Sequence, residues 1–126
     1  MRSIKFIILS SLTLFGITGG EIAASKPERI LACDMSALTP EQRTRHRAMT
    51  ARLLEHATRQ ELADGYLFTI ERQHLSVPDL AEWVANESRC CPAVDFHLEL
   101  PAFGPLTVRL DGGADVKAFV AAELGL

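Results

Sequence analysis

The stretch SVPDLAEWVANESRCCPAVDFHLEL, Ser76 to Leu100, decides most of the fold. Its first half predicts a helix over residues 79–91, because Ser76 can cap a helix and Pro92 cannot continue one. Its second half alternates apolar and polar residues over 94–100, which is typical of a strand with one buried face. Two adjacent cysteines therefore lie where a helix gives way to a strand.

The remaining elements follow from the same kinds of pattern. The residues TPEQ from Thr39 combine an N-cap, a first-turn proline and a capping box, so a helix is predicted from there to about Leu62. Alternation over 66–70 predicts a strand, and alternation over 106–110 predicts a strand that returns in a hairpin. Helical spacing of apolar residues predicts a last helix from about 114 to 125.

These elements predict an α+β fold in a single small domain over residues 38–126, in the order α-β-α-β-β-α. A three-stranded sheet with the helices packed on one face buries the apolar stripes best. The first two strands are joined through a helix, which favours a parallel, right-handed crossover. Residues 25–37 are interpreted as a linker or an edge segment.

Residues 1–24 are predicted to be a secretory signal peptide. A basic start is followed by an apolar run over 6–17, too short to span a bilayer comfortably, and then by small residues. Two alternatives are a buried hydrophobic helix and a misassigned start codon. The leader predicts an exported, periplasmic protein, whereas a misassigned start would leave it in the cytoplasm.

The net charge and the predicted leader indicate which kinds of binding partner to expect. The formal net charge is −3 and the one basic cluster, Arg43 to Arg47, reads as a solvated helix face, so no nucleic-acid partner is predicted. Residues 30–33, Ile-Leu-Ala-Cys, resemble a lipoprotein cleavage box, although the charges of 26–29 argue against it. Membrane contact is therefore predicted only through the leader or through lipidation of Cys33.

Glu87 is the residue that departs from the pattern. On a helical wheel it lies on an apolar face with Leu80, Val84 and Cys91. A buried carboxylate needs a proton, a cation or a donor, and the candidates are the cysteine thiols, Tyr66 or a basic residue from another element. The alternative is a tilted helix whose edge exposes Glu87.

The cysteines leave three interpretations open. Cys90 and Cys91 can be buried apolar residues, or one of them can form a disulfide with Cys33 and leave one thiol free. The third is a thiolate site for a soft ion such as Hg(II), Cu(I) or Zn(II), with Cys33 as a third sulfur and Glu87 or His97 as a harder ligand.

The rest of the sequence adds no second site. The other histidines show no ligand spacing with one another and are interpreted as surface residues: His46, His56 and His74. No Gly-rich phosphate loop, serine elbow or CxxC motif is present, and no organic cofactor is predicted.

The residues from Ala32 onward resemble a small, uncharacterised bacterial family whose signature is W-x3-E-x2-C-C-P-F. Trp83, Glu87 and the Cys-Cys-Pro at 90–92 match by position, whereas Ala93 stands where the family has phenylalanine. The resemblance implies no established activity. It implies only a contextual association with resistance to mercury or other soft metals.

The sequence thus predicts a soft-metal or metalloid binding protein, with a metal ion or a small thiol-reactive ligand as its partner. The predicted ligands are Cys90 and Cys91, with Cys33 and Glu87 in support. One alternative is a thiol-dependent enzyme with Cys91 or Cys90 as nucleophile and Glu87 as acid or base, in thiol transfer or organomercurial cleavage. The other is a disulfide-stabilised interaction module without chemistry.

Overall fold

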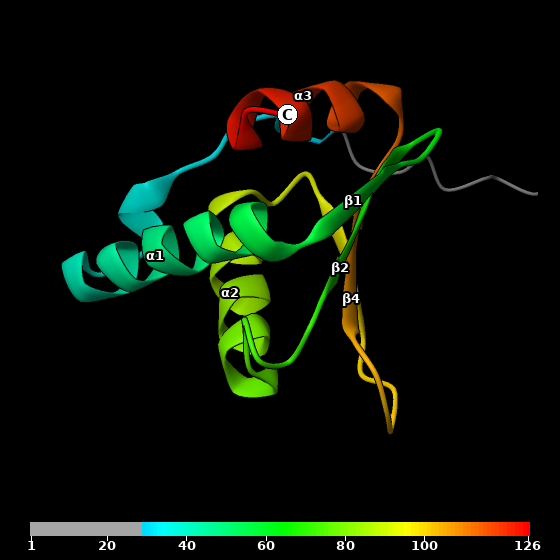
Figure 1. The fold of residues 1–126 in the computed structure, drawn as a ribbon. Helices are drawn as coiled ribbons and strands as arrows, with labels where there is room; N and C mark the ends of the chain where they lie inside the picture. Colours follow the sequence, from blue (N-terminus) through cyan, green and yellow to red (C-terminus); the bar gives the residue numbers. More distant parts are fainter. Residues whose placement is uncertain (1–28) are drawn as a thin grey trace, which may run out of the picture.

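The computed structural model describes residues 29–126, so the predicted leader lies outside the described part. Figure 1 shows an α+β domain in which the helices lie on one side of a sheet. The elements within 29–126 are a 3-10 helix η1 (Met35–Ala37), α1 (Pro40–His56), β1 (Thr58–Glu61), β2 (Gly65–Ile70), α2 (Val77–Cys90), β3 (Asp95–Glu99), β4 (Leu106–Asp111) and α3 (Ala114–Leu124).

The sheet corrects the predicted topology. Over the described residues it has four strands in the order β1-β2-β4-β3, and every neighbouring pair is antiparallel. The strands before and after α2 do run in the same direction, since both are antiparallel to β4, but β4 lies between them. The predicted parallel direction is therefore confirmed, but the two strands are not neighbours, because β4, with Leu106 and Val108 fully buried, takes the central place and leaves the more polar β3 at the edge.

β1 was missed because its sequence carries no strand pattern. The residues Thr58–Glu61 are all exposed, and the helix was predicted to continue through them to Leu62. In the structure α1 ends at His56, and β1 pairs with β2 through a hairpin, with Glu61 opposite Tyr66. Pairing along one edge, rather than burial of a face, makes this segment a strand.

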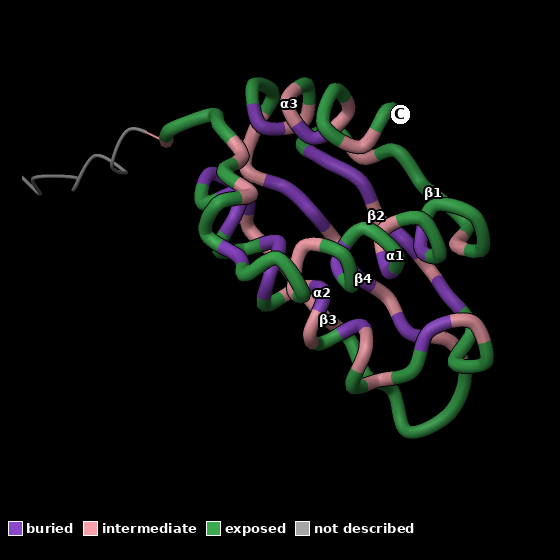
Figure 2. Tube along the Cα trace, turned by 90° about the vertical axis from the view of Figure 1, so that its left-hand side faces the viewer, coloured by how far each residue is buried: buried purple, intermediate pink, exposed green. Residues whose placement is uncertain are grey.

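The core lies between the sheet and the helices. Figure 2 shows buried residues along β2 and β4 and on the inner sides of the helices. Phe68 on β2, Leu110 on β4 and Trp83 on α2 are each at most 1% exposed. Burial of large apolar side chains of this kind supplies most of the stabilisation of such a small domain.

The predicted N-caps of α1 and α2 are confirmed, although α2 begins at Val77, two residues earlier than predicted. The side chain of Thr39 accepts a hydrogen bond from the backbone N–H of Gln42, whose side chain accepts one from the N–H of Thr39, which completes the capping box of α1. Ser76 caps α2 through the N–H of Asp79. Because α2 ends at Cys90 and Pro92 follows, Cys91 is the first residue outside the helix.

The segment before η1 is attached to the end of α2. The N–H of Asp34 donates to the carbonyl of Cys90 at 2.8 Å, and the guanidinium of Arg89 donates to the carbonyl of Ala37 at 3.0 Å. Arg29 donates to the carbonyl of Ala93 at 2.6 Å. These contacts satisfy carbonyl groups near the helix end and hold Cys33 beside it.

In the described part of the chain, no helix combines the length and the apolar character that crossing a membrane requires.

Candidate functional site

A disulfide joins Cys33 of the amino-terminal segment to Cys91 at the end of α2. It bridges residues 58 positions apart and fixes the segment onto the helical layer. Of the interpretations that the sequence left open, the structure therefore contains the disulfide between Cys33 and one of the two adjacent cysteines, with one thiol left free. Among the cysteines, all of which lie in the described range, Cys90 remains a free thiol.

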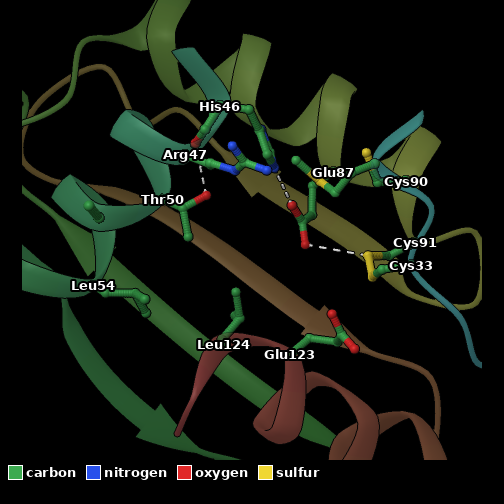
Figure 3. Close-up of a pocket in the computed structure, with 12 residues that line it drawn as sticks. Cys33, His46, Arg47, Thr50, Leu54, Glu87, Cys90, Cys91, Glu123 and Leu124 are labelled. Atoms are coloured by element: carbon green, nitrogen blue, oxygen red, sulfur yellow. Dashed lines mark hydrogen bonds and ion pairs between the residues drawn. A yellow bond between two sulfur atoms is a disulfide. The ribbon is translucent and has the colours of Figure 1, made fainter. Parts of the chain in front are cut away.

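Cys90 and Cys91 do not turn toward one site, which corrects the predicted vicinal thiol pair. Cys90 is the last helical residue and is 1% exposed, and in Figure 3 its sulfur points away from the disulfide. Burial, and next the charge of Glu87, raise the pKa of the Cys90 thiol above its usual value. Cys91 has non-helical backbone angles, and its sulfur meets Cys33 instead.

Glu87 is buried, as its position on the apolar face predicted, and is 9% exposed. Its Oε2 lies 2.5 Å from Nε2 of His46, and its Oε1 lies 3.5 Å from Sγ of Cys91. The carboxyl group therefore lies between an imidazole and the disulfide, as Figure 3 shows. Of the donors proposed for it, the structure provides a basic residue from another element, His46 on α1.

The interpretation of His46 as a surface residue was wrong. Its ring is 3% exposed and stacks against Trp83, with ring centroids 6.0 Å apart. The sequence held a signal for this, since His46 lies three and seven residues before Met49 and Leu53, on the same stripe of α1. The spacing between the histidines does not reveal this position, whereas the spacing of His46 from the apolar residues of α1 does.

The second ring nitrogen of His46 has no protein partner. Within residues 29–126, Nδ1 of His46 is the one buried side-chain nitrogen or oxygen atom that makes no hydrogen bond. An imidazole whose Nε2–H donates to Glu87 has a bare Nδ1, which is the tautomer that costs least at such a position. This tautomer leaves the Oε1 atom of Glu87 directed at the sulfur of Cys91.

Three of the four predicted metal ligands meet at one place. The sulfurs of Cys33 and Cys91 and a carboxylate oxygen of Glu87 lie within 4.8 Å of one another. The fourth, Cys90, does not join them. His97, considered as a harder ligand, lies elsewhere, with Nε2 3.1 Å from Asp111 of β4.

A cavity of about 390 Å³ opens beside this cluster. The amino-terminal segment, α1, α2 and the end of α3 each contribute to its wall. Figure 3 shows the disulfide and Glu87 on one side and α3 on the other. Most of the wall surface is apolar, and the lining residues are Cys33, Met35, His46, Arg47, Thr50, Ala51, Leu54, Glu87, Cys90, Cys91, Glu123 and Leu124.

The sequence did not predict the α1 and α3 sides of this cavity. Thr50 illustrates the reason, because its hydroxyl accepts a hydrogen bond from the indole of Trp83 at 2.8 Å and donates one to the carbonyl of His46. Such a contact depends on how α1 crosses α2, and sequence patterns do not specify that crossing.

No protein-family model matches the chain, and no match was found among curated proteins or solved structures. The predicted resemblance to the W-x3-E-x2-C-C-P-F family therefore stays a prediction. The structure shows an α+β domain in which a disulfide, the buried carboxyl group of Glu87 and the imidazole of His46 lie beside one cavity. This arrangement is compatible with thiol chemistry or with soft-metal binding.

Proposed function

We propose that the reduced protein binds one soft metal ion through Cys33 and Cys91, with Glu87 as a supporting ligand. The observation that carries the proposal is the convergence of these three ligand atoms within 4.8 Å. Thiolates favour soft, polarisable ions such as Hg(II), Cu(I) and Zn(II), and a nearby carboxylate adds a harder oxygen. Reduction of the disulfide supplies the two thiolates.

Two neighbours of the cluster support this choice. His46 holds the second oxygen of Glu87 at 2.5 Å, which is how a residue behind a metal ligand fixes the ligand's orientation. The cavity gives an ion a route to the sulfurs from outside the chain. Cys90, predicted as a core ligand, has no part in this version of the proposal because its thiol is packed in the core.

An exported location belongs to the same proposal. The Cys33–Cys91 disulfide supports it, since disulfides persist in oxidising compartments such as the bacterial periplasm. In that setting a thiol reductant must first convert the disulfide to two cysteine thiols, with oxidation of the reductant to its own disulfide, before a metal ion binds. The ion or a small thiol-reactive ligand is then its partner.

Mass spectrometry under non-denaturing conditions tests the proposal. The protein is reduced, freed of reductant, and mixed with one equivalent of Hg(II) or Zn(II). We expect a single adduct, lost in the Cys33→Ala/Cys91→Ala variant and kept in Cys90→Ala, its matched control. An adduct that survives in Cys33→Ala/Cys91→Ala, or none in the native chain, would contradict the proposal.

A thiol-dependent enzyme is a second candidate, and the 3.5 Å contact between Glu87 Oε1 and Cys91 Sγ favours it. The two thiolates would bind the metal of an organomercurial while the carboxyl group donates a proton to its carbon. The carbon–mercury bond then breaks, and its electron pair forms the new C–H bond. Incubation of the reduced protein with phenylmercury tests this, because cleavage releases benzene. Absence of benzene while phenylmercury binds would leave only the binding function.

A further inference from the structure

The two sulfurs of the disulfide differ in their surroundings. Cys33 is partly exposed, whereas Cys91 is 3% exposed. Both line the cavity, but only Cys91 lies against the carboxyl group of Glu87, at 3.5 Å. A reagent in the cavity therefore reaches Cys33 more easily, and Cys91 is the sulfur that would leave.

We propose that the Cys33–Cys91 disulfide is redox-active and exchanges with small thiols that have an apolar body, which enter the cavity. This activity uses the same sulfurs as the metal site but does not require that a metal binds. The carboxyl group of Glu87 lies beside Sγ of Cys91, the sulfur that would leave, and His46 holds the other oxygen of that carboxyl group at 2.5 Å.

The exchange takes place in two steps. The thiolate of the first thiol attacks Sγ of Cys33, forming a mixed disulfide, and the electron pair of the Cys33–Cys91 bond passes to Cys91 as a thiolate. The thiolate of a second thiol attacks the sulfur of the first thiol in the mixed disulfide and releases Cys33 as a thiolate. Solvent protonates Cys33 and Cys91, which take up the two protons that the thiols lost. Two thiols are oxidised to one disulfide, and the protein disulfide is reduced.

The cavity determines the class of thiol. Its volume of about 390 Å³ holds a small molecule, and aliphatic side chains from η1, α1 and α3 form much of its wall. These are Met35, Ala51, Leu54 and Leu124. A thiol with an aromatic or aliphatic body buries that surface, whereas a polar thiol of similar acidity does not.

The rate of disulfide reduction in chelator-treated, metal-free protein tests the proposal. Benzyl mercaptan and 2-mercaptoethanol are monothiols of similar acidity, and each is used with the folded and with the urea-unfolded chain. We expect the folded protein to favour benzyl mercaptan at least about tenfold more than the unfolded chain does, because binding precedes attack. A preference equal to that of the unfolded chain would overturn the role of the cavity.

Variants on α1 make the test specific. Ala51 lines the cavity and Ala48, also exposed on α1, does not. Ala51→Phe should remove the preference for benzyl mercaptan, and Ala48→Phe should keep it. Equal behaviour of the two variants would contradict entry through the cavity.

If the rate at which the native protein is reduced does not rise with thiol concentration, and equals the rate of global unfolding, the disulfide is purely structural and the proposal fails. Because the metal assay uses protein that is already reduced, each proposal fails independently of the other.

Discussion

Cys90 and Cys91 are adjacent in the chain and both line the cavity, yet the end of α2 points their sulfurs in different directions. Cys90 is the last helical residue and belongs to the buried core, as do Leu80 and Trp83. Cys91 leaves helical geometry, with φ −120° and ψ 73°, and its sulfur faces the cavity beside Glu87. One residue of displacement separates a buried free thiol from a disulfide sulfur.

The difference shows that the position of a helix end can determine the chemistry of a site. Had α2 continued by one residue, Cys91 would have followed Cys90 around the helix by about 100°. Pro92 prevents that continuation, because its ring clashes with the backbone of the preceding residue and disfavours helical angles there.

Removing the disulfide should have the largest effect. Cys33→Ala opens a loop between residues 58 positions apart, and the chain-entropy model gives a loss of about 4 kcal/mol. Urea unfolding of the oxidised protein measures this loss as a change in free energy of unfolding. Reduced native protein should match Cys33→Ala, and reductant should leave that variant unchanged. A variant as stable as the oxidised native protein would contradict a stabilising role for the bond.

His46→Ala should have the next largest effect. It leaves the buried carboxyl group of Glu87 without its hydrogen-bond partner, which costs about 3 kcal/mol. The matched control is His97→Ala, because His97 is about half exposed and Asp111 keeps a contact to Arg109 at 3.2 Å. We expect the control to lose less than about 1 kcal/mol. Equal losses would show that burial does not distinguish the two pairs.

The sequence predicted those parts of the fold that local pattern specifies. Three signals were predicted correctly because each acts over only a few residues. They are the capping box at Thr39, the alternation in β2 and the end of α2 before Pro92. β1 and the central place of β4 depend on pairing between distant segments. An edge strand such as Thr58–Glu61 buries no face, so no periodicity marks it.

Of the site, too, the sequence predicted only the part that a local pattern specifies. Glu87 was placed correctly because a carboxylate within an apolar stripe contradicts the pattern around it. Its partner His46 lies 41 residues away on another helix, and only the packing of α1 on α2 brings the two together. Adjacency in sequence suggested a Cys90–Cys91 pair, whereas the helix end directs the two side chains to different regions.

Cys90→Ala should have a smaller effect than either earlier variant. Cys90 behaves as a small apolar core residue, so removing its sulfur leaves a minor cavity and costs about 1 to 2 kcal/mol. Thermal unfolding measures the loss, and thiol titration of the native oxidised variant should find no free thiol. Loss of the Cys33–Cys91 disulfide in this variant would show that the two adjacent cysteines are not independent.

The reactivity of Cys90 gives the mildest test, because it changes no residue. Only the thiolate is alkylated, and burial raises the pKa of this thiol, so less thiolate is present at a given pH than in the unfolded chain. With iodoacetamide at pH 8, we expect Cys90 in the folded, oxidised protein to react more slowly than in urea, because its pKa is raised and its side chain is buried.

The pH dependence of that reaction has a definite sign. The folded state keeps the proton of Cys90 to a higher pH than the unfolded chain does, so this group stabilises the fold below its unfolded pKa. The contribution is lost as the pH rises through the raised folded pKa, and alkylation should accelerate over the same interval. If Cys90 reacted as fast in the folded protein as in urea, its sulfur would be open to the cavity. The two adjacent cysteines would then share one environment, and the vicinal thiol site predicted from the sequence would be restored.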